Sequence, residues 1–366
     1  MRVALITGLH RSARRASVDA LLAASPGSVV VHHDLGEIGE GVVHRVTRDG
    51  TGRADRSEVH LVHACASCTL REDLLPFLVR TARKGLHDLC VVEAWDGVEP
   101  QLIAEAVAAE PSLTLALVAT AVDGDLLLDD LTCADELGDR DLDIAQDDER
   151  TVTEVLTRQI EYPAVVALHG SSEHGEARAL LEQLNPGAVV VPAGACLGEL
   201  AHGVFDPEAA NVRLNPVWAQ YGDRADGRVT TVTWTRTRPL HPQRLADALD
   251  TVVSLGLRGR GRFWLASRPD SLLVWDSHNE LLMVENGGPW LDALPGAALD
   301  LVSETRRASA LLDWEPDVGD RRQHLAFTGI DLDGDALVQI LDSCLVTDEE
   351  TGQEHTTDPF AEFSER

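Results

Sequence analysis

Lysine is almost absent from this chain of 366 residues, which contains Lys84 as its one lysine beside thirty arginines. Basic residues are also outnumbered, because 31 Lys and Arg residues face 61 Asp and Glu residues and leave a formal net charge of −30. Such a charge disfavours binding to the phosphates of nucleic acid and to anionic membrane surfaces. We therefore expect neither a nucleic-acid partner nor a membrane partner.

We also expect neither an export signal nor a membrane-spanning run. The first apolar run, residues 1–7, ends at Gly8 without a cleavage site, which predicts a buried strand instead of a signal peptide. No later run is long enough to span a bilayer, so we expect a cytoplasmic protein. Among six cysteines only Cys65 and Cys68 lie close together, a pattern that favours reduced thiols with a candidate metal site over a disulfide framework.

The first part of the chain alternates short apolar runs with helical or loop segments. We predict strands at residues 3–7, 29–33, 89–93, 113–120 and 165–169. This alternation predicts an α/β fold with a doubly wound, mostly parallel sheet. Ligands of such sheets bind beyond the carboxyl ends of the strands, where Gly8, His33, Glu93 and His169 fall.

A second, smaller α+β domain is predicted after a break in the pattern. We expect the first domain at residues 1–214, a linker at 215–228, the second domain at 229–351 and a frayed polar tail at 352–366. Within the second domain, His241 and Pro242 open a predicted helix, and Asp331 or Asp333 caps a final helix that runs through Cys344. Its predicted strands are 229–235, 263–267, 272–275, 281–285 and 325–329.

The turn after the first strand has the position of a phosphate-binding loop but lacks much of its chemistry. Such a loop needs glycines whose backbone wraps the phosphates, a lysine on the β- and γ-phosphates, and a Ser or Thr hydroxyl on Mg²⁺. Gly8 stands at the first glycine, whereas Ala13, Arg14 and Arg15 occupy the places of Gly, Lys and Ser or Thr. The candidate phosphate contacts are therefore Gly8, Arg14 as a charge, and Ser12, which is out of register.

Several further motifs together resemble one family. The stretch from Cys65 to Arg71 is similar to the Cys-x-Cys-Cys motif and Thr-x-Arg helix start of the CobW-like P-loop GTPases, a family that handles transition metals. Other similar segments are residues 34–39, 93–100, 121–124, 148–150, 159–162, 238–242, 263–270 and 329–333. The resemblance covers roughly residues 1–351 and implies a P-loop-type sheet with a CobW C-terminal domain. In this family the GTP state is thought to gate metal loading and delivery to a client protein.

The chain departs from the family at both nucleotide motifs. His169-Gly170-Ser171-Ser172 stands where the family has Asn-Lys-x-Asp, so the carboxylate that reads guanine and its neighbouring lysine are both missing. Arg15 supplies no hydroxyl to anchor Mg²⁺. These replacements predict the loss of GTP hydrolysis, although the fold is that of a nucleoside-triphosphatase.

The metal motif is changed less. Ser67 replaces the middle cysteine and leaves Cys65 and Cys68 with a C-x-x-C spacing that can hold a tetrahedral ion. We predict that His63, His33 and Asp34 supply further ligands if the loops meet, a mixed thiolate and imidazole set that suits Zn²⁺. The alternative is that both cysteines are inherited and idle.

Three hypotheses follow from these motifs. The first is a zinc-binding, metallochaperone-like protein of metal homeostasis that no longer hydrolyses GTP and serves a client metalloprotein. The second is an active GTP-binding and GTP-hydrolysing metallochaperone with an atypical phosphate loop, in which Arg14 replaces the lysine. The third is an interaction protein that keeps only the fold.

Overall fold

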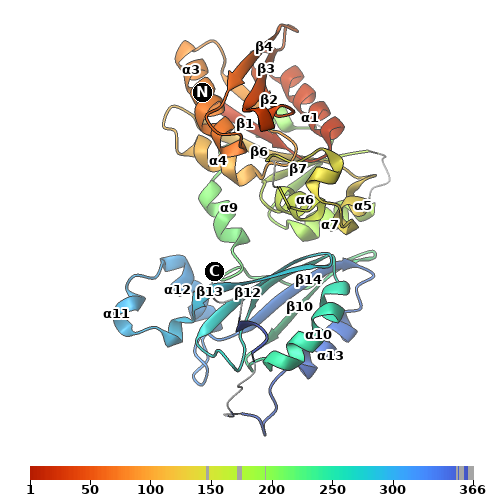
Figure 1. The fold of residues 1–366 in the computed structure, drawn as a ribbon, viewed down its shortest axis with the longest axis vertical. Helices are drawn as coiled ribbons and strands as arrows, with labels where there is room; N and C mark the ends of the chain where they lie inside the picture. The colour runs from red at the N-terminus through yellow and green to blue at the C-terminus, as the bar shows by residue number, and fades with distance from the viewer. Residues whose placement is uncertain (146–147, 171–174, 194, 352, 354–357, 362–366) are drawn as a thin grey trace. The chain divides into compact units, whose positions relative to one another are not determined.

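The computed structural model describes residues 1–145, 148–170, 175–193, 195–351, 353 and 358–361, and its chain divides into two compact units, Met1–Asn211 and Val212–Arg366. Each unit contains one sheet (Figure 1). Among the described residues no helix has the length and apolar character needed to cross a membrane.

Unit 1 is built on an eight-stranded sheet with the order β4-β3-β2-β5-β1-β6-β7-β8. The strands are β1 (Arg2–Thr7), β2 (Val29–Asp34), β3 (Val42–Asp49), β4 (Ala54–His60), β5 (Leu89–Glu93), β6 (Thr114–Asp123), β7 (Val165–His169) and β8 (Val189–Pro192). From β2 to β8 all neighbours in this order are parallel, which confirms the predicted doubly wound α/β fold. The strands at 89–93 and 165–169 have the predicted bounds.

Helices α1 to α7 lie between these strands along the chain, and α8 and α9 follow β8. They are α1 (Arg11–Ala24), α2 (Ala66–Cys68), α3 (Leu75–Lys84), α4 (Pro100–Ala108), α5 (Leu127–Thr132), α6 (Val152–Glu161), α7 (Gly175–Leu184), α8 (Leu197–Leu200) and α9 (Pro207–Leu214), the last of which contains the boundary between the units. Three shorter turns are η1 (Ile38–Glu40), the π-helical η2 (Thr69–Leu74) and η3 (Leu137–Arg140). Val18 and Leu21 of α1 pack on the apolar face of the central strands, so this helix is held firmly beside β1.

The sequence did not predict the antiparallel hairpin β3–β4, which extends the sheet beyond β2. Its strands are half-exposed and rich in polar residues, so they lack the continuous apolar run of the buried parallel strands. The hairpin places Arg45 and Arg48 beside the end of β2, where they contact residues of the candidate site.

Unit 2 is an antiparallel sheet with the order β13-β12-β11-β14-β10-β9. Its elements are β9 (Arg224–Asp226), β10 (Val229–Arg236), α10 (Pro242–Ser254), β11 (Arg258–Phe263), β12 (Ser271–His278), β13 (Leu281–Pro289), η4 (Leu291–Ala293), α11 (Gly296–Leu299), α12 (Glu304–Asp313), β14 (Gln323–Ile330) and α13 (Gly334–Ser343). His241 and Asp333 cap α10 and α13 through their side chains. Trp234, Trp275 and Phe327 form the centre of its core.

Two details of this unit differ from the sequence expectations. The predicted strand 263–267 ends at Phe263 and begins at Arg258, because Gly259 and Gly261 obscure the apolar pattern. Gly261 has φ +145°, and a Cβ atom there would lie 2.0 Å from the carbonyl oxygen of His324, so only glycine fits. The segment predicted as a linker contains strand β9, which pairs with β10.

The predicted polar tail is not frayed throughout. Phe360 is 1% exposed and packs edge-on against Phe263 in the core of unit 2. Asp358 accepts hydrogen bonds from Arg268 at 2.5 Å and from Ser267 at 3.0 Å. One apolar side chain and one carboxylate therefore attach residues 358–361 to the domain, a contact that the polar composition of the tail conceals.

Candidate functional site

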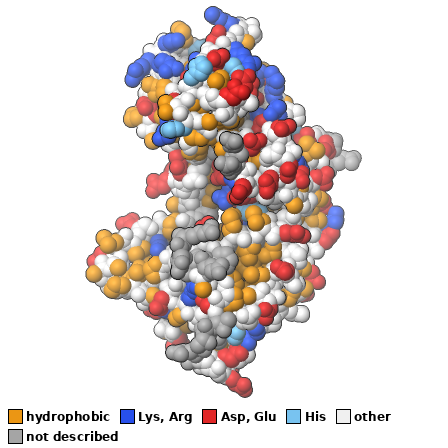
Figure 2. Space-filling model, viewed as in Figure 1, with side chains coloured by type: hydrophobic (Ala, Val, Ile, Leu, Met, Phe, Trp, Pro, Cys, Tyr) orange, Lys and Arg blue, Asp and Glu red, His pale blue; other side chains and the backbone are white. Residues whose placement is uncertain are grey.

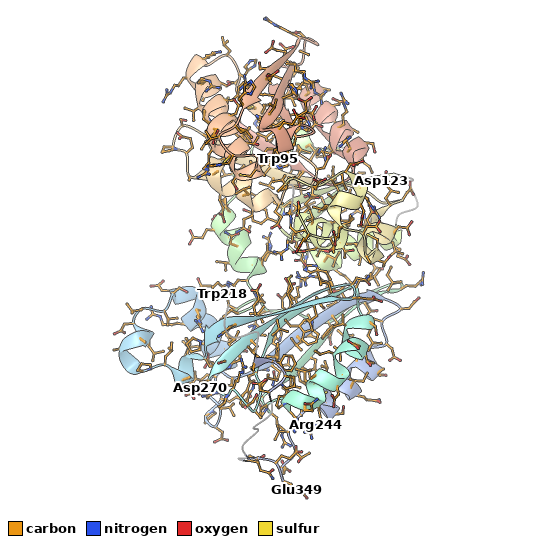
Figure 3. All side chains as sticks on the ribbon, in the orientation of Figure 1. Trp95, Asp123, Trp218, Arg244, Asp270 and Glu349 are labelled. Carbon is orange, nitrogen blue, oxygen red and sulfur yellow. The ribbon has the colours of Figure 1, made fainter. Side chains whose placement is uncertain are left out.

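A cavity of 820 Å³ lies at the carboxyl ends of β2 and β5, beside the start of α1. Trp95 lies just beyond the end of β5, and Figure 3 labels it in unit 1. The wall combines arginines, carboxylates and histidines; its charged and aromatic members are Arg11, Arg14, Arg15, His32, His33, Asp34, Arg48, Glu93, Trp95, Asp96, Asp141 and Asp143. This is the edge at which parallel sheets bind ligands, as the strand pattern predicted.

Arg14 is folded into its own loop. Its guanidinium is buried, donates hydrogen bonds to the carbonyl oxygen of Gly8 and to Asp96, and lies 4.0 Å from Glu93. Arg11 donates a second hydrogen bond to Asp96. Burial raises the pKa of Asp96, but the charges of Arg14 and Arg11 outweigh it and hold that pKa below its usual range. The cation that replaces the phosphate-loop lysine is thus neutralised by protein carboxylates.

Gly8 is required by packing, whatever ligand the loop meets. Its φ is +130°, and a Cβ atom would lie 2.2 Å from the carbonyl oxygen of Ala121 in β6. Arg14 donates a hydrogen bond to the carbonyl oxygen of Gly8, so these two candidate phosphate contacts bind each other. Ser12 lines a neighbouring cavity of 600 Å³ at the first turn of α1, together with Arg140 and with Arg15, which lines both cavities.

His10 holds this loop against a distant part of the chain. The backbone N–H of Asp123 donates to His10 Nδ1 at 2.7 Å, so the ring proton sits on Nε2, which lies 2.8 Å from Asp130. Arg140 also pairs with Asp130. Sequence reasoning missed His10 because its partners are more than a hundred residues away.

The position that the resemblance assigns to guanine recognition is also engaged within the protein. His169 Nε2 lies 2.6 Å from Ser17 Oγ of α1, and burial lowers the pKa of His169. Gly170 has φ +106° and follows β7 directly. Ser171 and Ser172 lie outside the described residues.

Cys65 and Cys68 share one helical turn. The N–H of Cys68 donates to the carbonyl oxygen of Cys65 at 3.1 Å and to its Sγ at 3.4 Å. Cys65 is half-buried and Cys68 is buried, while Arg71 Nη2 lies 3.7 Å from Cys68 Sγ. A hydrogen bond with Cys65, followed by burial, raises the pKa of the Cys68 thiol. The two sulfurs are therefore neighbours, as the spacing predicted.

The side chains of the other predicted metal ligands, His63, His33 and Asp34, do not form a metal-binding group with this pair in the described part of the chain. His63 is exposed and contacts Cys65 through the backbone, where its carbonyl oxygen accepts the N–H of Cys65 at 2.9 Å. Asp34 accepts a hydrogen bond from the N–H of Gly36 and pairs with Arg56 at 3.5 Å. In the described part of the chain, no three His, Cys, Asp or Glu side chains are grouped so that they could hold a metal ion.

His33 belongs to a different network. It is buried, its Nε2 lies 2.8 Å from Asp73, and its ring packs edge-on against Trp95 with centroids 6.2 Å apart. Burial lowers the pKa of His33, although Asp73 opposes that shift. Arg45 of the hairpin pairs with the same Asp73. Asp73 lies on η2, which follows Cys68 directly. This network therefore joins the end of β2 to the turn after the cysteine pair.

The chain around the cysteine pair is basic, in contrast to the whole protein. Residues 42–84 contain eight Lys or Arg residues and five Asp or Glu residues, in a chain of net charge −30. Figure 2 shows Lys and Arg side chains gathered on this part of unit 1. Arg71, Arg80 and Lys84 are exposed members of this set. Of this basic set, Arg71 is a residue that contacts a thiol of the pair, through its Nη2 atom and Cys68 Sγ.

Comparison with known proteins gives matches that extend over both units. The family model described as the cobalamin synthesis protein cobW C-terminal domain matches residues 229–345. Zinc chaperone Rv0106 of Mycobacterium tuberculosis is 31% identical over 375 residues, which cover 94% of this chain and 90% of that protein. Zinc-regulated GTPase metalloprotein activator 1 of Dictyostelium discoideum is 27% identical over 341 residues, which cover 84% of this chain and 70% of that protein. The Zn(II)-bound YjiA GTPase from E. coli is 14% identical, with a TM-score of 0.38 over 94% of this chain and 99% of that one.

Proposed function

Because the chain belongs to the CobW-like P-loop GTPase family, we propose that it is a metallochaperone that binds zinc through Cys65 and Cys68, delivers it to a client metalloprotein and does not hydrolyse GTP. The names of its relatives, a zinc chaperone and a zinc-regulated metalloprotein activator, support the choice of metal and of client. The corresponding cellular role is zinc homeostasis.

The observation that carries the zinc assignment is the pairing of two thiols on one turn. Thiolates are preferred ligands of Zn²⁺, which takes four ligands in a tetrahedron. Two protein sulfurs leave coordination positions for water, for a further side chain such as that of His63, or for the ligands of a client. A carrier must release its ion, and an incompletely closed site allows ligand exchange more readily than a closed structural site does.

We propose the loss of GTP hydrolysis because the Arg14 guanidinium is already bound within the protein. In an active loop, the lysine charge contacts the β- and γ-phosphates, and a hydroxyl anchors the Mg²⁺ that bridges them. Here the cation is committed to Gly8, Asp96 and Glu93, and Arg15 has no hydroxyl. Binding of a triphosphate in the same place would bring its charge close to the two carboxylates, which is unfavourable.

Isothermal titration of the reduced, metal-free protein tests the proposal. Zn²⁺ should give a saturable signal that disappears in the Cys65→Ser/Cys68→Ser double variant, whereas Cys133→Ser/Cys196→Ser serves as a matched control that retains it. GTP with Mg²⁺ should give no heat and no released phosphate. Equal zinc binding by the double variant would overturn the assigned ligands, and phosphate release above a protein-free blank would overturn the loss of hydrolysis.

One observation favours the alternative of an active GTP-binding protein. The 600 Å³ cavity at the start of α1 is lined by Arg11, Arg15 and Arg140, and the exposed Arg15 forms no ion pair with another described residue. If this cavity takes a nucleotide, GTP should bind to the wild type and more weakly to Arg15→Ala. A zinc signal without any GTP signal would reject this alternative.

A further inference from the structure

The cysteine pair has a second chemical capacity besides metal binding. An i to i+3 hydrogen bond closes the turn between Cys65 and Cys68 at 3.1 Å, and such turns hold their terminal Cα atoms within about 7 Å. Disulfides need Cα atoms about 4.4 to 6.8 Å apart. The backbone N–H of Cys68 donates to Cys65 Sγ at 3.4 Å, which holds the Cys65 sulfur over the turn that carries Cys68. The turn is therefore prearranged for a short intrachain disulfide.

The surroundings also fit a reactive thiol pair. Peroxide must first reach an accessible thiol, whereas buried cysteines in apolar surroundings are inert. Cys65 is partly exposed, Arg71 Nη2 lies 3.7 Å from Cys68 Sγ, and the surrounding residues 42–84 are net basic. Ser67, the residue that stands between them in place of a third cysteine, is exposed and cannot compete for the disulfide.

We propose that Cys65 and Cys68 form a reversible disulfide when hydrogen peroxide reaches the metal-free protein, and that this oxidation switches off zinc binding. The regulatory part of this inference rests on the proposed function, because it assumes that the same two sulfurs hold zinc. The disulfide itself does not depend on that assumption.

The reaction balances in two steps. The thiolate of Cys65, the more accessible sulfur, attacks one oxygen of the peroxide, which breaks the O–O bond, forms a sulfenic acid and releases hydroxide that is protonated to water. The sulfur of Cys68 then attacks Cys65 Sγ, the S–O bond breaks, and the oxygen leaves as a second water. The two sulfurs together lose two electrons, which the peroxide takes up with the two thiol protons. A dithiol reductant reverses the reaction.

The remaining four cysteines do not share these features. Cys90 of β5 is fully buried, and burial raises the pKa of its thiol to about 12. Cys344 is buried at the end of α13, and Cys133 lies beyond α5, where its Sγ donates to the carbonyl oxygen of Asp130 at 3.4 Å. Cys196 is exposed and stands before α8. It provides an internal control for general oxidation without a neighbouring thiol.

Zinc and the disulfide exclude each other in this scheme. Metal binding uses the lone pairs of both thiolates, and the disulfide removes both thiolates. Zinc-loaded protein should therefore be oxidised more slowly than metal-free protein, and oxidised protein should bind no zinc until it is reduced.

The test treats the reduced, metal-free full-length protein with hydrogen peroxide and follows the tryptic peptide of residues 57–71 by mass spectrometry. This peptide contains Cys65 and Cys68 and no other cysteine. We expect it to become lighter by two hydrogens, to regain them with dithiothreitol, and to show no such loss in Cys68→Ser. Cys196→Ser is the matched control, in which the two-hydrogen loss persists. A parallel titration with Zn²⁺ and a chromogenic indicator should show loss of zinc binding on oxidation and its return on reduction.

The outcomes separate this inference from the proposed function. If peroxide oxidises Cys196 while peptide 57–71 keeps both thiols, the switch is overturned, and zinc binding by the reduced protein would still uphold the metallochaperone. If the disulfide forms but the reduced protein binds no zinc, the proposed function and the control of zinc binding both fail. If the oxidised protein binds zinc as tightly as the reduced protein, the control of zinc binding alone is overturned.

Discussion

His33 Nε2 and Asp73 Oδ2 lie 2.8 Å apart. This contact joins the carboxyl end of strand β2 to η2, the π-helical turn that follows the cysteine pair. Both residues are buried, and Arg45 from the β3–β4 hairpin pairs with the second oxygen of the same carboxylate. Three separate elements therefore meet at one carboxylate. The cysteine turn owes its position on the sheet to this meeting point as well as to apolar packing.

Replacing this carboxylate should loosen that meeting point. Asp73→Asn keeps the size of the side chain but removes the charge that His33 and Arg45 contact. We expect a loss of about 2 kcal/mol in the free energy of unfolding of unit 1, because hydrogen bonds to charged groups contribute about 1.5 to 3 kcal/mol. Urea unfolding measures this, with the exposed neighbour Glu72→Gln as the control. Equal midpoints for the two variants would show that the network has no energetic role.

Arg14 and Arg15 should behave oppositely despite being adjacent. Arg14→Met leaves Asp96 and Glu93 without the buried cation that faces them, which should destabilise the protein by about 3 to 5 kcal/mol. Arg15→Met, at an exposed position, should change stability by no more than about 0.5 kcal/mol. Thermal unfolding compares the two variants. A small effect of Arg14→Met would mean that the loop does not depend on its internal cation.

Unit 2 should lose stability when His324, one of its buried histidines, is protonated. The N–H of Tyr221 donates to His324 Nε2 at 3.0 Å, which requires a neutral ring, and burial with the nearby charge of Arg262 lowers the pKa of His324 to about 4. The unfolded chain binds this proton near pH 6.5. Stability from this group is thus complete above pH 6.5 and is lost as the pH falls toward 4, by up to about 3 kcal/mol.

A variant without the imidazole checks that assignment. His324→Gln cannot titrate in this range, so its unfolding free energy should fall less steeply than that of the wild type between pH 7 and pH 4. Exposed His63→Gln serves as the control and should reproduce the slope of the wild type. Parallel pH profiles for wild type and His324→Gln would contradict the assignment.

The end of the chain should contribute to the stability of unit 2. Phe360→Ala removes a fully buried ring from the core, and such substitutions cost about 3 to 5 kcal/mol. Leu312→Ala, at a residue that is 75% exposed, is the matched control and should have little effect. The midpoint of denaturant unfolding distinguishes them. If both variants unfold at the wild-type midpoint, the tail does not support the core.

The parallel sheet was predictable because its strands are short, continuous and apolar, as at residues 89–93 and 165–169. The β3–β4 hairpin was not predictable in the same way, since its strands are half-exposed, rich in polar residues and without a continuous apolar run. The cysteine pair followed from spacing alone, because residues three apart share a turn. The contacts of His33 with Asp73 and of His10 with Asp130 span 40 and 120 residues, and nothing in the local pattern of the chain indicates them.

The sequence by itself determined the family, the fold class, the acidic character and the replacement of the residues that act on nucleotide and magnesium. Each of these depends on residue identity or on local periodicity, which the linear chain contains in full. Only the tertiary structure decided which charged and titratable side chains pair. Arg14 pairs with Asp96, His33 lies against Asp73, and Asp34 pairs with Arg56. Pairing among buried charges depends on which distant elements meet and on the cost of leaving a charge unpaired there, and both are properties of the folded chain.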